Sequence, residues 1–178
     1  FPLASLVLES EQRPGRVTLA EGLEQSHYLA LALYRLGIGK GDVVAVQLPT
    51  WIEAALLSQA IWLLEAVLLP VSAIYGVSDL SYILEDAGAK ALFLPGLWRG
   101  RDYREGVAEL RNCKRLREII VLDESAPSGS IDWPSFRREV GGELPVRTAS
   151  ADALAVLMYT SGTTSRPKGV LHSHNTLL

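Results

Sequence analysis

The sequence predicts an α/β fold in which helices flank a mainly parallel sheet. Three observations support this prediction. Short, mostly apolar runs that suit buried strands alternate along the chain with segments that suit helices. No internal repeat or low-complexity tract divides the 178 residues, so the chain is expected to form one domain or part of one. With 48% hydrophobic and 21% charged residues, a chain of this length can bury a core.

Two capping boxes predict where the first two helices begin. In such a box, a threonine side chain accepts from the backbone N–H three residues later, and a glutamate at that later position reaches back. Thr18-Leu19-Ala20-Glu21 predicts a helix that ends near Gly37. Thr50-Trp51-Ile52-Glu53 predicts a second helix, which continues to about Glu65.

Two more helices and five strands complete the predicted order. One helix is predicted between an N-cap at Ser78 and a glycine stop at Gly88, and another over Asp102–Cys113. Residues 123–131 and 141–150 are predicted to be surface connections. The predicted strands are short and mostly apolar: Val43–Leu48, Val67–Val71, Lys90–Leu94, Glu118–Leu122 and Ala153–Tyr159.

A hydroxyl-rich loop follows the last predicted strand, and Gly169-Val170-Leu171 is expected to return as another strand. Glycine lets a backbone approach a ligand closely, and successive N–H groups can bind an anion. Hydroxyls add donors without charge, and a lysine adds a compact positive charge for phosphate oxygens. The candidate phosphate-binding residues are Thr160, Ser161, Gly162, Thr163, Thr164 and Lys168.

Familiar glycine motifs do not account for this loop. It is not a Walker A motif, because Pro167 stands where that motif needs its second glycine. Residues 37–42 come nearest to G-x-G-x-x-G but end in Asp42, so they are interpreted as a helix stop and a turn. A solvated linker is the plain alternative for the loop itself. Such linkers seldom lie between two apolar runs while carrying a proline and a lysine, which favours phosphate binding.

The run Tyr159–Val170 resembles the phosphate-binding signature of the adenylate-forming enzymes. That superfamily includes acyl-CoA synthetases, the adenylation domains of peptide synthetases and firefly-type luciferases. Ser165 stands where the family pattern usually has glycine. The fold that this resemblance implies is the N-terminal portion of the large domain of these enzymes, with the phosphate loop between two strands.

Three further stretches carry the same resemblance. Gly37–Pro49 is similar to the pattern G-x-x-x-G-D-x-V-A-x-x-L-P. Ala66–Pro70 is similar to a G-A-V-x-x-P strand in which Glu65 replaces the glycine, and Asp79–Lys90 to a helix and strand that end in A-K. The match extends from about Val17 to the last residue and corresponds to the opening part of a family member.

The resemblance implies a two-step reaction with ATP, Mg²⁺ and coenzyme A. A small-molecule carboxylic acid attacks the α-phosphate of ATP, and the acyl group of the resulting adenylate then passes to a thiol. The six candidate residues would hold the β- and γ-phosphates, and Mg²⁺ would accompany ATP with few protein ligands. Family members carry the acyl pocket, the adenine contacts and a C-terminal domain with a catalytic lysine further along the chain. Residues 1–178 are therefore expected to be a partial N-terminal AMP-binding domain, without the C-terminal domain, without a catalytic residue and without turnover of their own.

The resemblance leaves several functions open. An acid–CoA ligase, as in fatty acid metabolism, is favoured over an amino-acid-adenylating domain. The chain could also be a non-catalytic nucleotide-binding remnant of a shortened gene, or an unrelated NTPase with a new phosphate loop. Neither the particular carboxylic acid nor the oligomeric state follows from the sequence.

Composition excludes some partners. A net charge of −3 provides no basic patch for nucleic acid or an anionic membrane surface. The apolar stretch over 54–71 is interrupted by polar residues and Pro70, so it is predicted to be a buried helix and a strand rather than a membrane span. Cys113, the single cysteine, excludes an internal disulfide and fits a reducing compartment, so a cytoplasmic protein is expected. That thiol is predicted to be an unreactive helix residue.

Histidine and tryptophan side chains are expected to pack rather than to bind. His172 and His174 have a spacing that two metal ligands on a strand could use, but no third ligand is close in sequence. Packing and capping roles are therefore favoured for both, and no metal site is predicted. Trp51 and Trp62 are expected to belong to the core.

Overall fold

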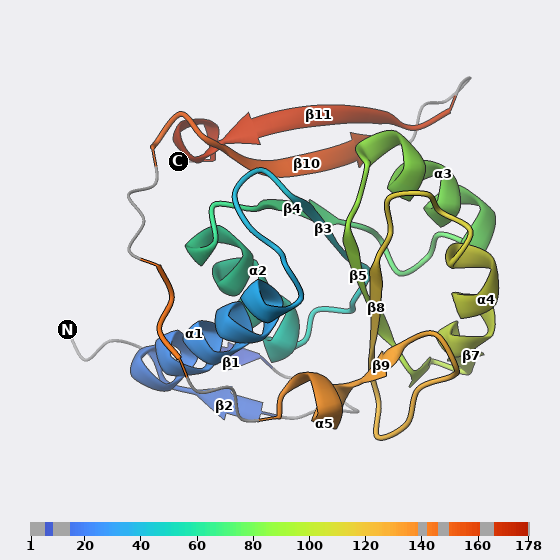
Figure 1. The fold of residues 1–178 in the computed structure, drawn as a ribbon, viewed down its shortest axis with the longest axis horizontal. Coiled ribbons are helices and arrows are strands. Elements are labelled where there is room, and N and C mark those ends of the chain that lie inside the picture. The colour runs from blue at the N-terminus through green and yellow to red at the C-terminus, as the bar shows by residue number, and fades with distance from the viewer. Residues whose placement is uncertain (1–5, 9–14, 139–141, 146–149, 161–165, 178) are drawn as a thin grey trace.

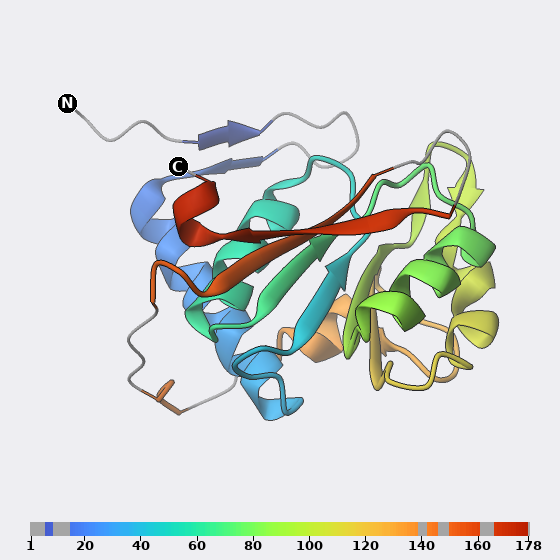
Figure 2. The same cartoon turned by 90° about the horizontal axis from the view of Figure 1, so that it is seen from above.

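A seven-stranded sheet forms the centre of the chain. Figures 1 and 2 show how the strands and helices are arranged around it. The computed structural model describes residues 6–8, 15–138, 142–145, 150–160 and 166–177. Neighbouring strands of the sheet are parallel except for the outermost pair, β10 and β11, which is antiparallel. The strands are, in sheet order, β11 (Lys168–Ser173), β10 (Leu154–Thr160), β4 (Val67–Pro70), β3 (Val43–Val46), β5 (Ala91–Pro95), β8 (Glu118–Leu122) and β9 (Ile131–Asp132).

Helices cover both faces of this sheet. One core lies between the sheet and α1 (Leu19–Arg35), α2 (Ile52–Leu63) and α5 (Trp133–Phe136). The other lies between the sheet and α3 (Val77–Ala87) and α4 (Val107–Leu110). The predicted α/β fold, with helices that flank a mainly parallel sheet, is confirmed.

Alternation along the central strands assigns each side chain to one of the two cores. In β3, Val44 and Val46 belong to the first core and Ala45 to the second. In β5, Phe93 faces the first core and Leu92 the second, and neither is exposed to solvent. A strand buried on both faces needs apolar residues at every position, which is why these runs are continuous rather than alternating in the sequence.

Short elements surround the main sheet. Two small antiparallel hairpins, which the sequence did not predict, join β1 (Leu6–Leu8) to β2 (Gly15–Val17) and β6 (Leu97–Trp98) to β7 (Arg101–Asp102). Two 3₁₀ helices also occur, η1 (Tyr103–Gly106) and η2 (His174–Thr176). Within the described part of the chain, the helices are too short or too polar to cross a bilayer.

The first capping box is confirmed and the second is wrong. Thr18 accepts from the backbone N–H of Glu21 at 3.2 Å, and the Glu21 carboxylate accepts from the N–H of Thr18 at 2.8 Å. In α2, the N-cap is Trp51, whose side chain is buried in the first core. The helix therefore begins one residue later than predicted, and Thr50 and Glu53 no longer hold the positions that a capping box requires.

The limits of the next two helices also differ from the prediction. Gly76, and not Ser78, is the N-cap of α3, whereas Gly88 ends it in the left-handed conformation as predicted, with φ of 63°. The predicted helix over 102–113 is instead η1 followed by the short α4. Gly106 at this junction packs so closely that a Cβ there would lie 2.6 Å from Val77. The chain then turns before β8, which ends the helix ahead of Cys113.

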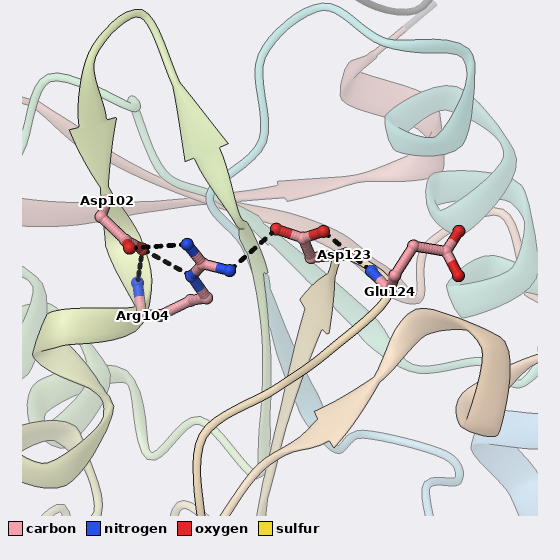
Figure 3. Close-up of polar contacts among 4 residues, drawn as sticks. All are labelled: Asp102, Arg104, Asp123 and Glu124. Atoms are coloured by element: carbon pink, nitrogen blue, oxygen red, sulfur yellow. Dashed lines mark hydrogen bonds and ion pairs between the residues drawn. The ribbon is translucent and has the colours of Figure 1, made fainter.

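An ion-pair cluster ties the end of β7 to the end of β8 (Figure 3). The Arg104 guanidinium donates to both carboxylate oxygens of Asp102, at 2.8 and 2.7 Å, and to Asp123 at 3.2 Å. The backbone of Gly96 closes over the Asp123 carboxylate, since a Cβ at Gly96 would lie 2.1 Å from that oxygen. The hydrogen bonds from Arg104 lower the pKa of Asp102.

We expect Arg104→Gln to lower the free energy of unfolding in a pH-dependent way. Asp102 has a lowered pKa in the folded state, so its contribution is fully present above its unfolded pKa of about 3.9 and is lost as the pH falls through the folded value. Urea unfolding at pH 7 should separate the variant from the wild type, and the difference should shrink below about pH 4. Arg117→Gln, which replaces an exposed arginine, is the matched control. A difference that is equally large at pH 3 would contradict this assignment.

Candidate functional site

The described part of the predicted phosphate loop lies where β10 ends and β11 begins. Thr160 is the last residue of β10 and Lys168 the first of β11, and their Cα atoms are register partners. The predicted strand on each side of the loop is confirmed. Four of the six candidate residues lie outside the described residues: Ser161, Gly162, Thr163 and Thr164.

A cavity of about 440 Å³ opens beside Thr160. Because β10 and β4 are parallel, Thr160 and Pro70 end their strands at the same edge of the sheet. Ligands of open α/β sheets bind outside the carboxyl ends of the strands, which is where this cavity lies. Its lining consists of Pro70, Val71, Ser72, Tyr75, Ile83, Met158, Tyr159 and Thr160.

Tyr159, the residue before Thr160, is fixed to helix α3. Its hydroxyl donates to the Asp86 carboxylate at 2.6 Å. Burial, followed by that hydrogen bond, raises the pKa of the Tyr159 phenol far above its usual range, so the phenol stays protonated at physiological pH. Across the strand pair, Gly169 leaves room for the ring, since a Cβ at Gly169 would lie 3.3 Å from Tyr159 and 2.9 Å from Leu157.

Two basic side chains flank the far end of the loop. The Arg166 guanidinium lies over the Tyr82 ring of α3, 5.1 Å from its centroid. Lys168 is exposed, and no carboxylate of the described residues forms an ion pair with it. The charge of Lys168 is therefore available to an anionic ligand that binds near its register partner Thr160.

Three side chains that the sequence analysis did not identify hold the backbone of residues 72–75, part of which lines the cavity. The fully buried Gln47 donates to the backbone oxygens of Ser72 and Tyr75, at 3.0 and 3.2 Å. Arg101 also donates to the Tyr75 oxygen, at 3.0 Å, and the Tyr103 hydroxyl donates to Ala73 at 2.7 Å. A polar glutamine directly after the apolar β3 run was the one available signal in the sequence.

A second cavity, of about 260 Å³, lies behind this segment near the ends of β3 and β5. Gln47, Arg101 and Tyr103 contribute to its lining, together with Glu105 and Glu109. The same three side chains hold residues 72–75, part of which lines the cavity of about 440 Å³. We therefore assign the second cavity a structural role, in support of the first.

His172 belongs to β11, and His174 follows that strand in η2. The His174 ring packs edge-on against Trp62, with centroids 6.0 Å apart, in agreement with the predicted packing role. The Trp62 indole N–H donates to the Ala155 oxygen of β10 at 2.9 Å, which links α2 to the strand before the loop. Among the described residues, no three His, Cys, Asp or Glu side chains are arranged as metal ligands.

Cys113 is a buried thiol that follows α4 rather than lying within a helix. Burial raises its pKa, and nearby Glu85 adds to this effect. A thiol in such an environment is a poor nucleophile, as its sequence context predicted.

Comparison with known proteins gives the family. The sequence profile described as AMP-binding enzyme matches residues 4–178. The chain belongs to the AMP-binding enzyme family. It is 31% identical over 144 residues to a medium-chain fatty-acid–CoA ligase of Escherichia coli (strain K12), covering 80% of this chain and 25% of that ligase.

One further relative and one solved structure with the same fold are also larger CoA ligases. The 3-[(3aS,4S,7aS)-7a-methyl-1,5-dioxo-octahydro-1H-inden-4-yl]propanoyl:CoA ligase of Mycobacterium tuberculosis (strain ATCC 25618 / H37Rv) is 33% identical over 167 residues, 89% of this chain and 32% of that protein. The crystal structure of the anthranilate CoA ligase AuaEII in complex with anthranoyl-AMP superposes with a TM-score of 0.84 and 22% identity, over 97% of this chain and 32% of that one. The chain thus spans a third or less of the length of these proteins.

Glu65 shows the physical reason for a glycine in the family pattern. This residue follows α2 and adopts φ of 54°, in the left-handed region that favours glycine. The glutamate carboxylate is largely buried and pairs with Lys40 at 2.7 Å. Glu65 therefore adopts the same left-handed backbone conformation that a glycine would adopt here, and its side chain also forms an ion pair.

Gly169→Ala should destabilise the β10–β11 pair by about 1 kcal/mol, because the new methyl group would press on Leu157 and the Tyr159 ring. Urea unfolding at pH 7 measures this change. Gly22→Ala, within α1, is the control: its Cβ would meet only ordinary contacts at 3.6 Å, and alanine is the better helix former. The two substitutions should therefore change stability in opposite directions, and equal effects would contradict the packing described for Gly169.

Proposed function

We propose that this chain carries the ATP phosphate-binding site of an acid–CoA ligase. In the full reaction, a carboxylate attacks the α-phosphate of ATP to give an acyl-adenylate and pyrophosphate, and the thiol of coenzyme A then accepts the acyl group. The proposed ligands of the β- and γ-phosphates are Thr160, Ser161, Gly162, Thr163, Thr164 and Lys168.

One observation carries this proposal: Lys168 and Thr160 face each other in register at the carboxyl edge of the sheet, beside a cavity. Lys168 offers three N–H donors and a full charge that no carboxylate of the described residues neutralises, and Thr160 offers a hydroxyl. This donor set suits phosphate oxygens, whose charge must be stabilised as pyrophosphate departs. Mg²⁺ is proposed to arrive with ATP, held mainly by phosphate oxygens and water.

The substrate class and the acceptor are proposed from relatives. The E. coli relative is named for medium-chain fatty acids, and the M. tuberculosis and AuaEII names also specify acid–CoA ligases. A second acceptor has some support, because a relative that matches 98% of this chain at 30% identity is named Salicyl-AMP ligase / salicyl-S-ArCP synthetase. A small carboxylic acid as substrate is common to all of these names. We further propose that the protein acts in the cytoplasm.

Binding of magnesium pyrophosphate tests the phosphate site directly. We expect the 178-residue chain to bind it in isothermal titration calorimetry, and Lys168→Ala to weaken binding by about tenfold through loss of a charge-assisted contact. Lys114→Ala, which removes another exposed lysine, is the matched control. Equal affinity of the wild type and the Lys168 variant would refute the role of this lysine.

The reaction itself is expected to need more than these residues. Because the chain spans a third or less of the relatives compared, we expect the 178 residues alone to release no pyrophosphate in a carboxylate-dependent manner. A coupled pyrophosphate assay with ATP, Mg²⁺, coenzyme A and a panel of fatty and aromatic acids measures this. Carboxylate-dependent release by the purified chain would overturn the expectation.

A further inference from the structure

Both ends of the phosphate loop contact the same face of helix α3. Figures 1 and 2 show α3 beside the end of β10 and the start of β11. Before the loop, Tyr159 donates to Asp86 at 2.6 Å. After the loop, the Arg166 guanidinium lies 5.1 Å from the centroid of the Tyr82 ring. Tyr82 and Asp86 are four residues apart, so their side chains are neighbours on one helix face.

Helix α3 is a rigid base for these contacts. Leu80, Ile83 and Leu84 on its inner face are at most 2% exposed and belong to the second core. A glycine in the left-handed conformation ends the helix directly after Ala87. A side chain that extends from such a helix holds its partner with little freedom to shift.

The two contacts lie close together. Tyr82 is near enough to Tyr159 to add, after burial and Asp86, to the rise in the pKa of the Tyr159 phenol. Gly169 of β11 leaves room for the Tyr159 ring, since a Cβ there would lie 3.3 Å from it. β10, β11 and α3 therefore meet at Tyr159.

We propose that Tyr82 and Asp86 are positioning residues for phosphate binding, holding the two ends of the loop in place against α3. This inference rests on the proposed function of the loop. Neither residue needs to touch the ligand: Asp86 acts through Tyr159, and Tyr82 acts through Arg166. Positioning matters because phosphate chemistry depends on donors that are already in place when the charge develops.

Substitutions that keep or remove each contact provide the test. Asp86→Ala removes the acceptor, whereas Asp86→Asn keeps an amide oxygen that can accept from Tyr159. Tyr82→Leu removes the aromatic face, whereas Tyr82→Phe keeps it. Glu24→Ala and Tyr28→Leu are the matched controls, since both residues are exposed on α1.

Hydrogen exchange is the first measurement, because it needs no ligand. We expect Asp86→Ala and Tyr82→Leu to speed amide exchange at Met158–Thr160 and Lys168–Val170 about threefold to tenfold, as one lost contact each would do. Asp86→Asn, Tyr82→Phe and both controls should exchange like the wild type. In a Tyr159→Phe background, Asp86→Ala should have no further effect, since its partner is already gone. Additive effects, or unchanged exchange in Asp86→Ala, would overturn the proposal.

Affinity for magnesium pyrophosphate is the second measurement. Asp86→Ala and Tyr82→Leu should weaken binding about threefold to tenfold, with rescue by Asp86→Asn and Tyr82→Phe. Faster exchange with wild-type affinity would make the contacts merely structural and would overturn the proposal. If the wild type binds no pyrophosphate, the proposed function fails, and the exchange rates alone then decide whether α3 holds the two strand ends.

Discussion

Four parallel strands, β3, β4, β5 and β8, are buried on both faces, and the rest of the structure depends on this constraint. Backbone N–H and C=O groups inside such a sheet are satisfied only by neighbouring strands, and side chains on both faces must be apolar. Ala45, Leu92 and Ile120 are 0% exposed for this reason. Helices must then cover both faces, which forces each connection to cross over and brings the carboxyl ends of β3, β4, β5 and β10 to one edge.

That edge is where polar groups can gather, because the chain leaves the apolar layers there. Gln47 follows β3 and uses its buried amide to hold the backbone oxygens of Ser72 and Tyr75 beyond the end of β4. Arg104 joins the carboxylate of Asp102, which ends β7, to that of Asp123, which directly follows β8. Thr160 ends β10 at the same edge, beside the 440 Å³ cavity. The framework around the candidate phosphate site therefore consists of hydrogen bonds between loops, supported by a sheet whose central strands are buried.

β10 and β11, at one edge of the sheet, are more exposed than the central strands. β11 is antiparallel to β10 and mostly exposed, including Leu171 at 60%. β10 pairs with β4 and contributes buried residues to both cores. β11 is held mainly by β10, and the side chains of Trp62, His174 and α3 add contacts to this strand pair. Small changes in these contacts act directly on the two ends of the loop, whereas changes in the central sheet act on the whole fold.

The sequence by itself determined the α/β class with helices beside a mainly parallel sheet, five strands to within about two residues at each end, and the position of the loop between two strands. Apolar runs and the Thr18 capping box are local signals, so they can be interpreted without neighbours. The helix limits near Thr50, Ser78 and Asp102 were predicted wrongly, because core packing of Trp51 and Gly106 decided where those helices start and stop. Only the tertiary structure brought Asp86 to Tyr159, 73 residues apart, since a contact between a helix face and a strand end depends on the assembled sheet and leaves no pattern in the local sequence.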